Sequence, residues 1–220
     1  GGRPASTSGM TRSHAAPMPV SRAGSSRWAL ARARSRYGAA IARDTTTEAE
    51  VVWVEIEHDG ERGYGEANPI DRYEESAESA LAYVEGVADS LGDDPFAFEE
   101  IESRLPEGEL AARAAIDAAL HDLCGKLTGL PVWRLLGLRR AGPPTSWTLG
   151  LGDPDETARK AERAHEFESL KLKLGGRDGL DVERVRSVRA VWDKPIRVDV
   201  NEYWTLDEAL ESIPQLQALG

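Results

Sequence analysis

The chain has 220 residues, of which 40% are hydrophobic and 30% charged, enough to build one large or two small globular domains. The formal net charge is −11, but residues 1–43 hold eight arginines and no acid, so the remainder carries 19 basic and 38 acidic groups. The net negative charge of residues 44–220 argues against nucleic-acid and membrane partners. No apolar run approaches the roughly 20 residues that cross a bilayer. We therefore expect a cytoplasmic protein whose single cysteine, Cys124, forms no internal disulfide.

The first half of the chain reads as strands followed by helices. Residues 1–25 are rich in arginine and serine, so we expect a disordered leader there and a first domain over 26–140. The stretch "AEVVWVEIEHDGERGYGEA" predicts two strands joined at Asp59 and Gly60, with a loop before it over 37–47. Helical patterns follow over 74–91, after Pro95, and over 107–127, where Gly129 marks the end. This order predicts an α+β domain.

From residue 141 onward, short apolar runs alternate with helical patterns. Strands are expected over 145–151, 169–174 and 196–201, and helices over 153–167, 178–192 and 205–219. Such units build either a doubly wound sheet or a barrel. A complete eight-unit barrel takes roughly 250 residues, and three parallel strands alone leave sheet edges bare. We therefore interpret residues 141–220 as the first three β-α units of an incomplete barrel in a C-terminally truncated chain of the α/β class.

Two of these strands carry closely spaced polar residues. Alternation in "SLKLKL" places Lys171 and Lys173 on one face and the leucines on the other, while "RVDVNE" places Asp199 and Asn201 on one face at a strand end. Carboxylate and amide oxygens suit Mg²⁺, although lysines in water or an Asp199–lysine salt bridge are open alternatives. Lysine, unlike arginine, can lose its proton, and two neighbouring ammonium groups favour that loss. The pattern is typical of proton removal α to a carboxylate.

Four segments carry a resemblance to a known family. They are "GYGEANP", "AARAAIDAALHDLCGKLTGLPVWRLLG", "KLK" and "RVDVNEYWTLDEAL". In this order and spacing the chain resembles the enolase superfamily, its muconate-lactonizing subgroup, and within that the dipeptide epimerases of the L-Ala-D/L-Glu type. The resemblance implies an enolase-type N-terminal capping domain over 26–140 followed by a modified TIM barrel.

The resemblance also implies roles for individual residues. Lys173 would be the acid/base on one face of the substrate α-carbon, and Lys171 would tune it and help neutralise an enediolate intermediate. Asp199 would be the first of three Mg²⁺ ligands, with Asn201 in a supporting position. Thr148 would contact the substrate.

Arg43 would belong to a mobile lid over the substrate. The other two metal ligands and an opposing lysine would lie beyond Gly220, so we expect this chain to be inactive by itself. The implied partner is a small-molecule carboxylate or dipeptide such as L-Ala-L-Glu, and a homo-oligomer is possible for the full-length protein.

Other functions stay open at this point. Muconate cycloisomerase, o-succinylbenzoate synthase and N-acyl-amino-acid racemase belong to the same subgroup and share the first half of the reaction. A non-catalytic binding or structural fragment is the alternative from a different class.

Overall fold

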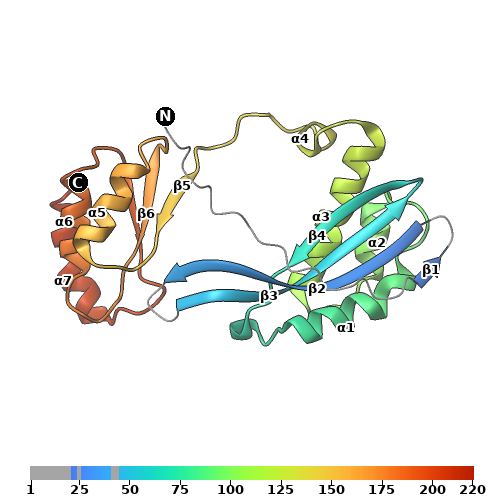
Figure 1. The fold of residues 1–220 in the computed structure, drawn as a ribbon, viewed down its shortest axis with the longest axis horizontal. Coiled ribbons are helices and arrows are strands. Elements are labelled where there is room, and N and C mark those ends of the chain that lie inside the picture. The colour runs from blue at the N-terminus through green and yellow to red at the C-terminus, as the bar shows by residue number, and fades with distance from the viewer. Residues whose placement is uncertain (1–20, 24–25, 41–44) are drawn as a thin grey trace, which may run out of the picture. The chain divides into compact units, whose positions relative to one another are not determined.

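A computed structural model describes residues 21–23, 26–40 and 45–220, and side chains from residue 49 onward (Figure 1). The chain divides into two compact units. The first contains the residues up to Arg36 and Glu48–Arg140, and the second contains Tyr37–Thr47 and Ala141–Gly220. Within the segment expected to be a leader, Ser21–Ala23 form a short strand, and the rest of that segment lies outside the described residues.

Most of a four-stranded sheet belongs to the first unit. Its strands follow the order β1 (Ser21–Ala23), β2 (Ser26–Ala40), β3 (Thr45–His58) and β4 (Glu61–Ala67). Residues 37–40 and 45–47 are therefore strand, and the loop expected there was wrong for these residues. These residues, "YGAA" and "TTT", are mostly small or polar and give no apolar alternation, so the pattern offered no strand signal.

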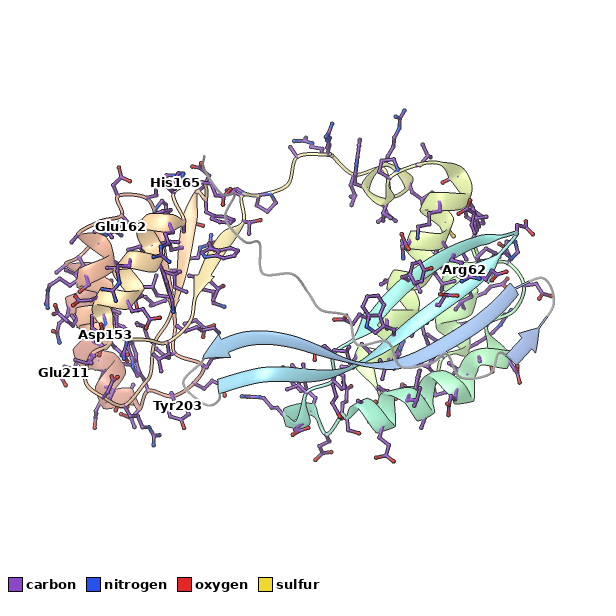
Figure 2. The ribbon with its side chains drawn as sticks, viewed as in Figure 1. Arg62, Asp153, Glu162, His165, Tyr203 and Glu211 are labelled. Atoms are coloured by element: carbon purple, nitrogen blue, oxygen red, sulfur yellow. The ribbon has the colours of Figure 1, made fainter. Side chains whose placement is uncertain are left out.

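The predicted hairpin between β3 and β4 is confirmed. The two strands pair antiparallel up to His58 and Glu61, and the connecting Asp59 and Gly60 both have positive φ, 50° and 84°. Two successive positive φ angles suit a two-residue hairpin turn. On the exposed face, Arg62 of β4, labelled in Figure 2, forms ion pairs of 3.2 Å with two glutamates of β3, Glu55 and Glu57.

Helices follow the hairpin, and those over 77–87, 98–104 and 110–128 match the patterns predicted over 74–91, after Pro95 and over 107–127. The helices are η1 (Asp71–Tyr73), α1 (Ala77–Val87), η2 (Ala88–Ser90), α2 (Phe98–Arg104), α3 (Leu110–Thr128) and α4 (Val132–Leu135). The first long helix begins at Ala77 because Ser76 and Ser79 form a reciprocal capping box. The α3 helix ends at Gly129, whose φ of 67° is the left-handed conformation that glycine adopts without strain.

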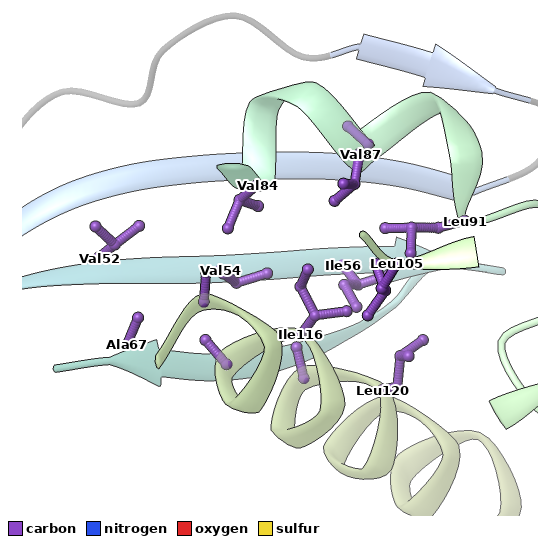
Figure 3. Close-up of a cluster of buried hydrophobic side chains, with 14 of the residues drawn as sticks. Val52, Val54, Ile56, Ala67, Val84, Val87, Leu91, Leu105, Ile116 and Leu120 are labelled. Atoms are coloured by element: carbon purple, nitrogen blue, oxygen red, sulfur yellow. The ribbon is translucent and has the colours of Figure 1, made fainter. Parts of the chain in front are cut away.

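The core of the first unit lies between the hairpin and its helices (Figure 3). Alternate residues of β3, namely Val52, Val54 and Ile56, point into it because strand side chains alternate between faces. Val84 from α1 and Ile116 from α3 meet them there. All five side chains are at most 1% exposed.

The two glycines of "GYG" allow α3 to approach β4 closely. A Cβ atom at Gly65 would overlap the carbonyl oxygen of Ala115, and one at Gly63 would overlap that of Ala119. Between them, the backbone N–H of Tyr64 donates to the Asp122 carboxylate over 2.9 Å. The "GYGEANP" motif therefore has a packing function in this unit.

The second unit confirms the three predicted β-α repeats. Its strands β5 (Ser146–Leu149), β6 (Ser169–Lys173) and β7 (Ile196–Asp199) form a parallel sheet in that order. Each strand is followed by a helix, α5 (Pro154–Arg163), α6 (Asp181–Arg189) and α7 (Leu206–Gln217) respectively. The described residues of this unit form an open sheet of three strands and not a closed barrel.

One face of this sheet is apolar and covered by helices. Leu170, Leu172 and Leu174 are at most 1% exposed and pack with Ala161 of α5 and Val188 of α6. The predicted direction of the leucines in "SLKLKL" is thus confirmed. In the part of the chain that the structure describes, no helix is both long and apolar enough to span a membrane.

Candidate active site

Strand register brings the polar residues of the second unit onto one face of the sheet. Thr148 pairs with Lys171 across β5 and β6, and Lys173 pairs with Asp199 across β6 and β7. Residues paired across neighbouring strands project to the same side of a sheet. Because the strands are parallel, Lys173 and Asp199, each the last residue of its strand, lie at the carboxyl edge.

The loops that follow the strands lie at this same edge. Figure 2 labels Asp153, which follows β5, and Tyr203, which follows β7; both lie toward the end of the unit where the strands finish. His165, which precedes β6, lies toward the opposite end. In α/β sheets, sites form at the carboxyl ends of the strands, where loops can add further groups.

Both lysines bind the same carboxylate oxygen of Asp199. Nζ of Lys171 lies 2.7 Å and Nζ of Lys173 lies 2.8 Å from Oδ2 of Asp199. The Lys173 side chain is 13% exposed and that of Lys171 is 38% exposed, so Lys173 is the more buried amine. The salt bridge considered as an alternative from the sequence is therefore present, and it involves both lysines.

Asp199 is held in its ionised form. Hydrogen bonds from Lys171 and then from Lys173 lower the pKa of its carboxyl well below the ordinary value, against an opposing effect of burial. The site thus combines one fixed negative charge with two ammonium groups. Its positive excess would attract an anionic ligand such as a carboxylate.

Asn201 completes the group through a tight turn after β7. Its backbone N–H donates to Oδ1 of Asp199 over 2.9 Å, and its side-chain Oδ1 accepts from Nζ of Lys173 over 2.8 Å. Asn201 and Glu202 have φ angles of 48° and 63°. Two consecutive non-glycine residues in the left-handed region are uncommon and cluster at functional sites.

The structure gives a position for one of the two predicted substrate-binding residues and not for the other. Thr148 is exposed and lies one strand away from Lys171, on the polar face. Arg43 lies outside the described residues, so the structure gives no position for it. Lys171, Lys173, Asp199 and Asn201 are therefore the predicted residues that the structure brings into direct contact.

A buried network behind this edge was not predicted. Arg184 of α6 is buried, and its guanidinium binds the carboxylates of Asp178 and Asp181. Asp181 in turn accepts from the indole Nε1 of Trp204 over 2.8 Å. The sequence did contain a signal for it, because Arg184 lies four positions before Val188 and therefore on the same face of the helix. That face is buried, and an unpaired charge there would be costly.

Matches to family models fall on both units. Residues 28–137 match the mandelate racemase / muconate lactonizing enzyme N-terminal domain, and residues 155–220 match the enolase C-terminal domain-like family. The chain belongs to the mandelate racemase / muconate lactonizing enzyme family. Its fold is that of the enolase superfamily, with an α+β capping unit followed by part of a TIM barrel, as the sequence predicts.

Individual members of the family are also similar to the chain. The L-Ala-D/L-Glu epimerase of Bacteroides thetaiotaomicron is 41% identical over 191 residues, which cover 84% of this chain and 49% of that protein. The dipeptide epimerase of Enterococcus faecalis, solved with Mg and L-Leu-L-Tyr, superposes with a TM-score of 0.78 at 30% identity, covering 91% of this chain and 59% of that one.

A third relative has a different substrate. The N-succinyl Arg/Lys racemase of Bacillus cereus gives a TM-score of 0.79 at 28% identity, covering 92% of this chain and 58% of that one. The chain spans about half the length of the curated relatives it matches. An epimerase and a racemase whose names give different substrates are therefore both similar to the chain.

The residues present fit Mg²⁺ in chemistry but supply only part of a site. Mg²⁺ prefers oxygen ligands in octahedral geometry, and Asp199 offers a carboxylate at the sheet edge. Both of its oxygens already accept hydrogen bonds, one from the lysines and one from the Asn201 backbone. Within the described ranges, no three His, Cys, Asp or Glu side chains gather closely enough to hold a metal. Asp199 alone thus qualifies as one ligand.

Proposed function

We propose that the whole protein is a Mg²⁺-dependent epimerase that removes the α-proton of a dipeptide such as L-Ala-L-Glu, with Lys173 as the base. The observation that carries the proposal is the position of Lys173, the more buried of two amines at the carboxyl edge of the parallel sheet, between Asp199 and Asn201. Support for the reaction comes from the 41% identity to an L-Ala-D/L-Glu epimerase.

The contacts of Lys173 leave one position on Nζ open to the substrate, which the base form of the amine would use. A neutral amine has two N–H groups and one lone pair, and Lys173 has two acceptors, Oδ2 of Asp199 and Oδ1 of Asn201, each at 2.8 Å. If both N–H groups donate to these acceptors, the lone pair is free to accept the substrate α-proton. The amine would take that proton while the electron pair of the broken C–H bond moves onto the substrate carboxylate.

Lys171 and Thr148 would act on the substrate from the same face. Lys171 is more exposed than Lys173 and, as an ammonium group, would balance the negative charge that develops on the substrate carboxylate. Thr148, beside it in the register, would offer a hydroxyl for hydrogen bonding. Asp199 would provide one oxygen ligand to Mg²⁺, which when bound would supply further stabilisation of the same charge.

Epimerisation also needs a proton donor on the opposite face of the α-carbon. Lys171 and Lys173 share one face of β6, so they cannot serve the two faces of one carbon. We therefore propose that the 220-residue chain by itself does not epimerise a dipeptide. Arg43, proposed as a lid residue, would act in the whole protein.

The test is α-proton exchange in D₂O, followed by loss of the substrate α-proton signal in proton NMR. We expect the whole protein to exchange the α-proton of L-Ala-L-Glu with Mg²⁺ and to lose this activity with a chelator. Lys173→Ala should abolish exchange of at least one substrate epimer. Lys160→Ala is the matched control, since Lys160 is exposed on α5 and pairs with Glu156.

Full exchange of both epimers by the Lys173→Ala variant would refute the role of Lys173. The similarity to the N-succinyl Arg/Lys racemase supports N-acyl amino acids as the alternative substrate class. Turnover of N-succinyl-L-lysine without turnover of L-Ala-L-Glu would therefore refute the dipeptide as substrate. Removal of the α-proton by Lys173 would still stand. Exchange of neither compound would favour a non-catalytic protein.

A further inference from the structure

Three loops follow the strands of the second unit, and a pair of charged residues on α6 contacts all of them. The loops are residues 150–153 after β5, 174–180 after β6 and 200–205 after β7. The pair is Arg184 and Asp181, whose side chains are 4% and 14% exposed and whose Nη1 and Oδ1 atoms lie 3.1 Å apart.

Arg184 connects the first two loops. Its Nε donates to the carbonyl oxygen of Gly152 over 2.6 Å, in the loop after β5. Its Nη1 donates to Oδ1 of Asp178 over 2.9 Å, in the loop after β6, and Nη2 also binds that carboxylate. A guanidinium is suited to this role because its planar donors can bind several acceptors in fixed directions.

Asp181 connects the second loop to the third. Its Oδ2 accepts from the backbone N–H of Gly175 over 2.8 Å and from the indole N–H of Trp204 over 2.8 Å. Gly175 is buried and comes two residues after Lys173, while Trp204 comes three residues after Asn201. One bond therefore holds the backbone just after Lys173, and the other holds a side chain just after Asn201.

We propose that Arg184 and Asp181 are positioning residues, which hold the three loops together and so fix where Lys173 meets Asn201. This inference rests on the proposed function for its catalytic part. It gives a reason why Arg184 is buried and Asp181 is half-buried, although removing charged groups from water is costly. It also explains how the strained turn at Asn201 is held in place.

The structural test is NMR of this chain with Arg184→Met, a substitution that keeps length and removes the guanidinium. We expect the Trp204 indole signal and the Asn201 side-chain amide signals to move. The Gly175 amide should exchange with solvent roughly tenfold faster, the loss expected for weakening one charge-assisted hydrogen bond. Arg186→Met is the matched control, because Arg186 lies on the same helix and forms an exposed pair with Glu183.

A folded Arg184→Met variant with unchanged Asn201 and Gly175 signals would overturn the inference. Should that variant not fold, Trp204→Phe removes only the indole donor and should still shift the Asn201 side-chain amide signals; unchanged signals there would equally refute it. Trp192→Phe is its control, since the buried indole nitrogen of Trp192 has no hydrogen-bond partner among the described residues.

The catalytic test uses the whole protein. Arg184→Met should lower kcat for α-proton exchange by roughly 10- to 100-fold, the loss that follows misplacement of a reacting group, while KM changes far less. A folded variant with unchanged kcat would refute the positioning role. If the unsubstituted protein exchanges no α-proton, the proposed function fails, and the NMR comparison still decides whether the pair orders the loops.

Discussion

Lys173 donates a hydrogen bond from Nζ to Oδ2 of Asp199 over 2.8 Å, and this bond joins the carboxyl ends of β6 and β7. The Lys173 side chain is largely buried, at 13% exposed, so its charge depends on this partner for compensation. The same two groups that are proposed to carry the chemistry therefore also contribute to the stability of the sheet edge.

Replacing Asp199 should destabilise the second unit. Asp199→Ala leaves Lys173 with the Asn201 oxygen alone, and we expect the free energy of unfolding to fall by roughly 1–3 kcal/mol, the range for removing a charged hydrogen-bond partner. Asp199→Asn keeps an acceptor oxygen and should cost less. Urea unfolding followed by circular dichroism measures both changes.

Asp193→Ala provides the control for this series, because Asp193 is an exposed carboxylate of the same unit. It should change the free energy of unfolding little. An Asp199→Ala variant as stable as the unsubstituted chain would show that the lysines need no compensating charge at this edge.

The faces of the barrel strands could be predicted from sequence because their signal is local. Side chains alternate along a strand, so "SLKLKL" was enough to assign Lys171 and Lys173 to one face and the leucines to the other. The same alternation assigned Asp199 at the end of β7. Parallel register then brought Lys173 and Asp199 together without any further information.

Contacts between distant residues could not be predicted in this way. Arg184 reaches back 32 positions to the carbonyl oxygen of Gly152, and Glu75 reaches forward 35 positions to the backbone of Leu110. No periodic pattern links such positions, so a sequence shows at most that a charged residue occupies a buried stripe. The pairing of Asp199 with both lysines at once belongs to this class as well.

The Glu75 carboxylate should stabilise the first unit by capping α3. It accepts from the backbone N–H groups of Leu110 at 2.5 Å and Ala111 at 3.3 Å, while Glu109, at the N-cap itself, provides no side-chain cap. A negative charge at a helix N-terminus also interacts favourably with the helix dipole. We expect Glu75→Ala to lower the free energy of unfolding by about 1–2 kcal/mol.

Thermal or urea unfolding of the variants tests this cap. Glu75→Gln, which keeps an acceptor and loses the charge, should fall between the alanine variant and the unsubstituted chain. Glu78→Ala, at an exposed position in the first turn of α1, should have a much smaller effect than Glu75→Ala. Equal effects at positions 75 and 78 would argue against a specific cap.

Close packing of α3 on β4 predicts opposite effects of two glycine-to-alanine substitutions. Gly65→Ala places a methyl group against the carbonyl oxygen of Ala115, so we expect a loss of roughly 1–3 kcal/mol in the free energy of unfolding. Gly86→Ala, in α1, places its methyl group in open space and should add about 0.5–1 kcal/mol. Unfolding curves that rank the two variants the other way would contradict the packing described for "GYG".

The pair of Asp178 and Arg184 predicts a loss of stability in acid. The Arg184 guanidinium lowers the pKa of the Asp178 carboxyl from 3.8 to about 2. Because the folded-state pKa is below the unfolded value, the contribution to stability is complete above pH 3.8 and is lost as the pH falls toward 2. Asp178→Asn should therefore show a smaller decline of unfolding free energy with falling pH in this window.

Asp193→Asn serves as the control for the acid series and should follow the pH curve of the unsubstituted chain. The measurement is urea unfolding at a series of pH values from neutrality downward. Identical pH curves for Asp178→Asn and the unsubstituted chain would show that this carboxyl contributes nothing to acid sensitivity.

Cys124 should react with thiol reagents only when the first unit opens. The thiol is buried on α3, donates from Sγ to the carbonyl oxygen of Pro95 over 3.2 Å, and has a pKa that burial raises to about 11. The reactive species is the thiolate, so both burial and the raised pKa slow modification. We expect slow labelling by an aromatic disulfide reagent at neutral pH and rapid labelling in denaturing urea. Because the chain has one cysteine, absorbance of the released thiol reports this site alone, and fast labelling of the folded chain would contradict its burial.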